Sequence, residues 1–187
     1  MPSVEHILAY DRNNQKHAGS SPNEKLFLWS LLHMSKYPKM LEIGVSRGHL
    51  TLWFALAQKA HKGEVVSVDN WSMSNGGAAA SCNHALKRLE DNGLSQYVTF
   101  VNSDSKAFLA NSQVGAFDFI WIDGDHTYEG ALADIELALA LSPKMIGVHD
   151  TAQGYAGPRN ACRAIETILG KQGTWVDGLR GIWLYTV

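Results

Sequence analysis

Cysteine is scarce in this chain, and its two cysteines do not form a metal-binding pattern. Cys82 and Cys162 are far apart in the sequence. Zinc sites built from cysteine need pairs of ligands at short spacing. We therefore interpret both residues as reduced thiols, which favours a cytoplasmic protein.

Long apolar runs and a surplus of basic residues are also missing. The longest apolar candidate, residues 131–141, is interrupted by Asp134 and Glu136, so no segment is long enough to cross a membrane. The first residues, MPSVEH, lack the basic start and apolar run of a signal peptide. The formal net charge is -2, which argues against a nucleic-acid partner. We expect a cytoplasmic protein with a small-molecule substrate and no membrane partner.

The length of 187 residues suits one domain, 1–187, with its own apolar core. Residues 1–22 are polar, and this composition predicts an irregular N-terminal arm. A helix is expected at 23–35, where Leu26, Trp29 and Leu32 recur at helical spacing, and Pro38 ends it. We interpret residues 1–38 as an N-terminal arm and helix, with a lid over the site as the hypothesis for their role.

Strand-like and helical segments alternate through the rest of the chain. Such alternation predicts an α/β fold, a Rossmann-like and mostly parallel sheet with helices on both faces. The last two strands have too short a connection for a parallel crossover, so we expect an antiparallel hairpin at one edge. The expected strands are 39–43, 64–68, 97–101, 117–122, 144–148, 174–176 and 181–187, and the expected helices are 49–60, 78–92, 105–110, 128–141 and 160–169.

A glycine-containing loop follows the first strand, in the sequence EIGVSRG at 42–48. In open α/β sheets, ligands bind beyond the carboxyl ends of the strands. Gly44 and Gly48 let the backbone turn and approach a ligand, and Ser46 between them belongs to the same candidate cofactor site. Glu42 would oppose a pyrophosphate but favours the positive sulfonium and amino groups of S-adenosylmethionine (SAM), and the strict G-x-G-x-x-G spacing is absent. The alternative is a plain tight turn with a surface glutamate.

Two further strand ends extend this candidate cofactor site. Asp69 ends the second strand and is placed to accept the ribose hydroxyls, with Asn70 beside it. Trp71 would pack against adenine or, equally, be a core aromatic. Asp104, with Ser103, would accept the adenine amino group or cap the next helix.

The sequence FDFIWIDGDHTYEG at 117–130 carries a resemblance to a known family. With the loop at 42–48, it is similar to class I SAM-dependent methyltransferases, in the subgroup of sugar and macrolide O-methyltransferases and cephalosporin-hydroxylase-like proteins. The resemblance implies seven strands in the order 3-2-1-4-5-7-6, with strand 7 antiparallel. Ser46 departs from the glycine that many relatives have.

Acidic residues and histidines end the fourth and fifth strands, which are neighbours in the expected order. Because such crowding of acids is costly, a bound divalent cation would offset it. The resemblance implies that Asp123, His149 and Asp150 hold the metal, magnesium in the relatives, and that His126 acts as base. His149 stands where relatives often have an acid, and imidazole suits manganese, iron or zinc better. Either the metal differs, or His149 is not a ligand, or no metal binds.

The expected reaction is transfer of a methyl group from SAM to the hydroxyl of a small molecule. His126 would take the proton, and Asp123 would assist it or hold the methionine amino group of the cofactor. A divalent metal would acidify the hydroxyl. The alternatives are an N-methyltransferase and a SAM-binding protein with a regulatory role. A further hypothesis is a homo-oligomer in which a second copy of the chain completes the pocket.

Overall fold

A seven-stranded sheet runs through the computed structural model, which describes residues 2–14, 19–72, 78–111, 115–178 and 180–187. The strand order is β3-β2-β1-β4-β5-β7-β6, as predicted, and β7 pairs antiparallel with both β5 and β6. The other neighbouring strands are parallel. The strands are β1 (Lys39–Ile43), β2 (Glu64–Asp69), β3 (Val98–Asn102), β4 (Phe119–Ile122), β5 (Met145–His149), β6 (Thr174–Val176) and β7 (Ile182–Thr186).

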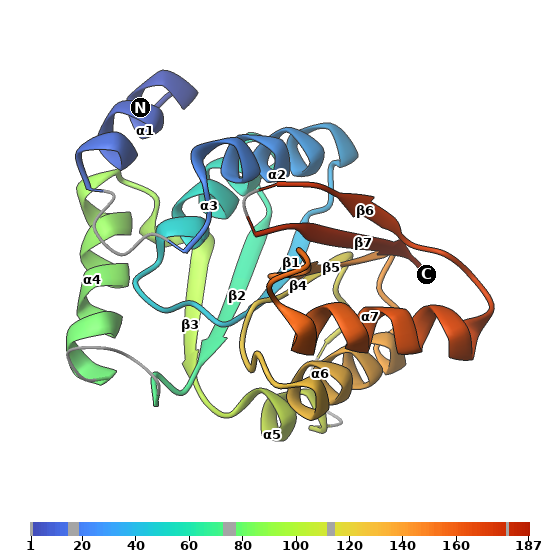
Figure 1. Cartoon of the computed structure of the whole chain (residues 1–187). Helices are drawn as coiled ribbons and strands as arrows, with labels where there is room; N and C mark the ends of the chain where they lie inside the picture. Colours follow the sequence, from blue (N-terminus) through green and yellow to red (C-terminus); the bar gives the residue numbers. More distant parts are fainter. Residues whose placement is uncertain (1, 15–18, 73–77, 112–114, 179) are drawn as a thin grey trace.

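Helices cover both faces of this sheet (Figure 1). One face packs against α2 and α3, and the opposite face packs against α5, α6 and α7. In the described part of the chain, no helix is long and apolar enough to span a bilayer. The helices are α1 (Val4–Asn13), α2 (Pro22–Ser35), α3 (His49–His61), α4 (Ala78–Asp91), α5 (Ser105–Leu109), α6 (Tyr128–Ala140) and α7 (Ala156–Leu169), with a short 3₁₀ helix η1 (Ser95–Tyr97).

Strand β4 shows why the central strands read as continuous apolar runs. All four of its residues are buried. Phe119 and Trp121 belong to the core under α2 and α3, whereas Ile120 and Ile122 belong to the core under α6 and α7. Successive side chains of a strand point to opposite faces, so a strand covered by helices on both sides must be apolar throughout.

The expectation of an irregular N-terminal arm was wrong for residues 4–13, which form α1. Ser3 caps this helix by accepting a hydrogen bond from the backbone of His6. Ile7 is fully buried beside Leu52 and Trp53 of α3. Contacts with distant helices, rather than local periodicity, therefore stabilise α1, and a single-sequence pattern does not reveal such contacts.

The starts of helices α2 and α7 also differ from the prediction. Helix α2 begins at Pro22 because Ser21 and Glu24 form a capping box, in which each side chain bonds the other residue's backbone N–H. Helix α7 begins at Ala156 instead of residue 160. Pro158 lies in its first turn, where the missing N–H of proline costs nothing.

The carboxylate of Glu166, on α7, holds the C-terminal hairpin to the body of the fold. Its Oε1 accepts hydrogen bonds from the backbone of Gly173 and from the indole N–H groups of Trp175 and Trp183. Trp183 is fully buried. One carboxylate thus satisfies buried donors of the connection to β6, of β6 itself and of β7.

We expect Glu166→Ala to lower the free energy of unfolding by about 3 kcal/mol, because the buried indole N–H of Trp183 would lose its acceptor. Urea denaturation followed by tryptophan fluorescence measures this change. Glu136→Ala, at an exposed position of α6, is the matched control and should change stability little. Equal stabilities of the two variants would contradict this role for Glu166.

Candidate active site

A cavity of about 910 Å³ opens where the parallel strands β1, β2, β3 and β4 end. This volume is in the range of small-molecule sites. Eight of the residues expected from the sequence to bind the cofactor or act in catalysis line it. They are Gly44, Ser46, Asp69, Asn70, Ser103, Asp104, Asp123 and His126, whereas Glu42, Gly48, Trp71, His149 and Asp150 do not line it.

The loop after β1 requires glycine at two positions. At Gly44, φ is +87°, and a Cβ atom would lie 2.0 Å from the backbone oxygen of Asp123. At Gly48, φ is +71°, and a Cβ would lie 2.8 Å from the backbone of Ala85. Gly44 therefore lets the loop approach the end of β4, and Gly48 lets α3 pack closely on α4. Ser46, where relatives often have glycine, adopts φ +50°.

Asp69 holds this loop in place. Its Oδ2 accepts hydrogen bonds of 2.8 Å from the backbone N–H groups of Val45 and Ser46, and its Oδ1 accepts one from the backbone of Trp71. The expected role was to bind ribose. The structure shows the carboxylate at the cavity wall and bonded to the loop.

Glu42 lies beneath the loop and not at its surface. The side chain is 1% exposed and accepts hydrogen bonds from the hydroxyls of Thr51 and Ser67. Burial raises the pKa of Glu42 to about 8, although both hydroxyls oppose this shift. Glu42 therefore does not lie at the loop surface, and its carboxyl holds a proton more strongly than an exposed glutamate does.

The structure shows where Trp71 and Asp104 lie, for each of which the sequence offered two roles. Trp71 is 4% exposed, packs with Val45 and Ala85, and donates its indole N–H to the backbone oxygen of Ser46. It is a core aromatic in this structure. Asp104 caps α5 through Oδ1, and it also lines the cavity.

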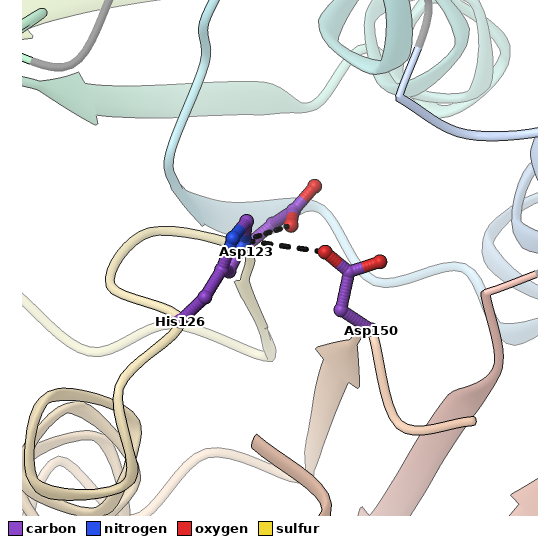
Figure 2. A group of neighbouring side chains, drawn as sticks. All are labelled: Asp123, His126 and Asp150. Carbon is purple, nitrogen blue, oxygen red and sulfur yellow. Dashed lines mark hydrogen bonds and ion pairs between the residues drawn. The ribbon is translucent and has the colours of Figure 1, made fainter. Parts of the chain in front are cut away.

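Two carboxylates and an imidazole converge at the ends of β4 and β5 (Figure 2). His126 Nε2 lies 3.3 Å from Asp123 Oδ1 and 3.3 Å from Asp150 Oδ2. Asp150 is 1% exposed, whereas half of the His126 side chain is accessible. A hydrogen bond with Asp123 raises the pKa of His126 and outweighs its burial.

His149 lies behind this group. It is 1% exposed, with Nδ1 at 3.3 Å from Asp123 Oδ2 and 3.5 Å from Asp150 Oδ1, and Nε2 at 3.9 Å from Glu24 Oε2. Burial alone would lower the pKa of His149, but these carboxylates raise it to about 10. Burial would likewise raise the pKa of Asp123, but His149 and His126 hold it at about 2.

Candidate metal ligands must bring their donor atoms together. The group found among the described residues is Asp123, His126 and Asp150, with ligand atoms within 4.8 Å of one another. The ligand set expected from the sequence had His149 in place of His126. His149 is not in the group because its ring faces the other oxygens of the same two carboxylates.

Sequence reasoning missed two residues of this region, Arg180 and Glu24. Arg180 Nη1 lies 3.3 Å from Asp150 Oδ2, and its guanidinium is above the ring of Tyr155. Glu24 accepts hydrogen bonds from the backbone N–H groups of Arg180 and Gly181. Glu24 fell within the helix expected at 23–35, but no local signal places either residue at the end of β5.

The family of the chain follows from comparison with known sequences. A family profile described as a methyltransferase domain matches residues 41–151, which is more than half of the chain and includes the glycine loop and both strand-end acids. No individually curated protein matches the chain. The chain therefore belongs to this methyltransferase family, and it is a SAM-dependent methyltransferase of class I.

Solved structures share the whole fold. An O-methyltransferase from Bacillus cereus, in complex with SAH, is 22% identical, with a TM-score of 0.72 and coverage of 100% of this chain and 93% of that chain. An O-methyltransferase from Streptomyces achromogenes involved in tomaymycin synthesis, in complex with SAM, is also 22% identical, with a TM-score of 0.71 and coverage of 99% and 91%. At this identity the likeness establishes the fold.

The raised pKa of Glu42 predicts a pH-dependent stability. The folded protein holds a proton that the unfolded chain releases, so this contribution is complete below the usual pKa of 4.5 and is lost as pH rises through about 8. Each pKa unit of the shift corresponds to about 1.4 kcal/mol. We expect the wild type to lose more stability than Glu42→Gln between about pH 6 and about pH 9, in urea titrations. Parallel losses in both proteins would contradict this prediction.

Proposed function

We propose that the protein transfers the methyl group of SAM to a hydroxyl oxygen of a small molecule, with His126 as general base. The observation that carries the proposal is the place of the His126 imidazole. It lines the cavity that begins at the glycine loop, and its Nε2 is 3.3 Å from Asp123. That strand-end acid approaches the loop at Gly44.

The proposed step moves one proton and one methyl group. Nε2 of His126 takes the hydroxyl proton, the oxygen forms a bond to the methyl carbon, and the carbon–sulfur bond breaks with its electron pair left on sulfur. SAH and the methyl ether are the products. Asp123 stabilises the imidazolium as it forms, because its carboxylate carries a full negative charge at 3.3 Å. The protein supplies positioning and charge control.

Two further observations support oxygen as the acceptor atom. The solved neighbours from Bacillus cereus and Streptomyces achromogenes are both described as O-methyltransferases. A hydroxyl oxygen also needs a base at the moment of transfer, and the cavity has one. A small-molecule acceptor is proposed over a nucleic acid because the net charge is -2. A cytoplasmic location and a homo-oligomer stay predictions.

A divalent cation fits the donor set of Asp123, His126 and Asp150, whose nitrogen and oxygen ligands suit manganese, iron or zinc better than magnesium. Such a cation would supply Lewis-acid polarisation of the acceptor hydroxyl. Nε2 of His126 cannot serve as ligand and base together. The carboxylate oxygens already have nitrogen partners on His126, His149 and Arg180 within 3.5 Å, which favours the role of base.

The test of the proposal is an SAH-release assay with the purified protein and a panel of small molecules, in which each phenol or alcohol is paired with the matching amine. Calorimetry with SAM and SAH first establishes that the cofactor binds. Turnover with hydroxyl compounds supports the proposal. Turnover with amines alone would make the protein an N-methyltransferase, and binding without any turnover would favour a regulatory role.

With the acceptor found in that panel, we expect His126→Ala to lower kcat by about 10²–10⁴-fold and to leave SAH affinity unchanged. Because the base must be neutral, the wild-type rate should rise with pH through a pKa above 6.5. Asp123→Asn should move this rise to lower pH, since Asp123 is the main cause of the raised pKa. A profile that stays in place in Asp123→Asn would exclude this assignment.

Removal of metals distinguishes between His126 as general base and His126 as metal ligand. We expect dialysis against EDTA to change the rate by less than about twofold, because the base needs no cation. Loss of activity on EDTA treatment, with recovery on adding Mn²⁺, would instead make His126 a ligand. Metal content of the purified protein, measured by mass spectrometry, is the control.

A further inference from the structure

Four ionisable side chains from four helices are buried together beside the cofactor loop. Asp11 of α1 is 2% exposed, Lys25 of α2 is 0%, His49 of α3 is 6% and Arg88 of α4 is 8%. The proposed reaction uses none of them. A fully buried lysine is rare unless it is paired, so the contacts of this cluster matter.

The hydrogen bonds fix the state of the His49 ring. Arg88 Nη2 lies 3.1 Å from His49 Nε2, and a guanidinium nitrogen can only donate, so Nε2 accepts. The ring proton is therefore on Nδ1, which donates to Asp11 Oδ1 at 3.4 Å. Lys25 Nζ donates to the other oxygen of Asp11 at 2.7 Å. His49 is thus neutral, in one tautomer and one orientation.

The cluster is attached to the cofactor loop at two points. His49 is the first residue of α3, directly after the loop glycine Gly48, and it lines the cavity. Arg88 also donates from Nε to the backbone oxygen of Arg47, another residue of the cavity wall. The guanidinium carbon of Arg88 lies 5.8 Å from the ring centre of Tyr10 on α1.

Stability alone does not account for this arrangement. The desolvation of buried charges offsets much of their mutual attraction, and apolar side chains of similar volume often serve equally well. The charged cluster instead fixes the orientation of two groups at the cavity wall, the imidazole of His49 and the backbone carbonyl of Arg47. The N-terminal helix, outside the segment that the family profile matches, supplies the acceptor for that imidazole.

We infer that His49 is a positioning residue of the cofactor cavity and that Asp11, from the N-terminal helix, sets its orientation, so that docking of α1 and binding of the cofactor are coupled. The inference rests on the methyl donor binding in this cavity. Asp11 and Arg88 act through His49 and through the Arg47 carbonyl. Anything that moves α1 away from the body would release the ring and weaken binding of SAM and SAH.

The test uses two double variants of the full chain, each with Lys25→Met so that the buried ammonium of Lys25 is not left without its partner Asp11. Asp11→Ala/Lys25→Met removes the acceptor for His49, whereas Asp11→Asn/Lys25→Met keeps an acceptor oxygen. Calorimetry with SAH should give an affinity at least about tenfold weaker for the alanine variant, which corresponds to about 1.4 kcal/mol, and recovery to within about threefold for the asparagine variant. Asp91→Ala, which removes the acceptor of the exposed Tyr10–Asp91 hydrogen bond between α1 and α4, is the control and should bind as the wild type does.

A measurement on the wild type keeps the inference testable if the alanine variant does not fold. Nitrogen-15 NMR of the histidine rings should show His49 protonated at Nδ1 only, with resonances that shift when SAH is added. An unshifted His49 ring, or folded double variants that all bind SAH as tightly as the wild type, would overturn the inference. Failure of the wild type to bind SAH would instead refute the cofactor assignment on which it rests.

Discussion

The close approach of two backbone loops, at Gly44 and Asp123, is the constraint on which the site depends. Strands β1 and β4 are parallel neighbours in register, with Ile43 opposite Ile122, so their following residues must pass each other. The N–H of Asp123 bonds the backbone oxygen of Ile43, and no Cβ fits at Gly44. The loop that receives the cofactor and the acid beside the proposed base are thereby held as one unit.

Charge balance governs the neighbouring end of the sheet. Asp123 follows β4 and Asp150 follows the neighbouring strand β5. Both carboxylates contact the same nitrogen of His126, and two negative charges so close together repel each other unless positive groups compensate them. The protein supplies those partners itself: His126 and Arg180 at the cavity, and His149 behind it. Since the imidazole of His126 contacts both acids, both raise its pKa, Asp123 more than Asp150.

The N-terminal helices take part in both regions. Glu24 of α2 reaches the turn at Arg180 and Gly181, and Asp11 of α1 reaches His49 beside the glycine loop. These contacts join residues more than a hundred positions apart in one case and almost forty in the other. The site is therefore a joint product of the strand ends and of helices that precede the first strand.

The sequence by itself determined the alternation of strands and helices, the glycine loop and the acids at the strand ends, because periodicity, turn residues and position after a strand are local properties. Only the tertiary structure decided that Glu42 is buried with a raised pKa, that Trp71 packs in the core, and that His126 joins Asp150 while His149 lies behind. The tertiary structure also decided that residues 4–13 form the helix α1. The physical reason is the same in each case: burial, and the partner that compensates it, come from residues distant in the chain, and a local pattern does not contain that information.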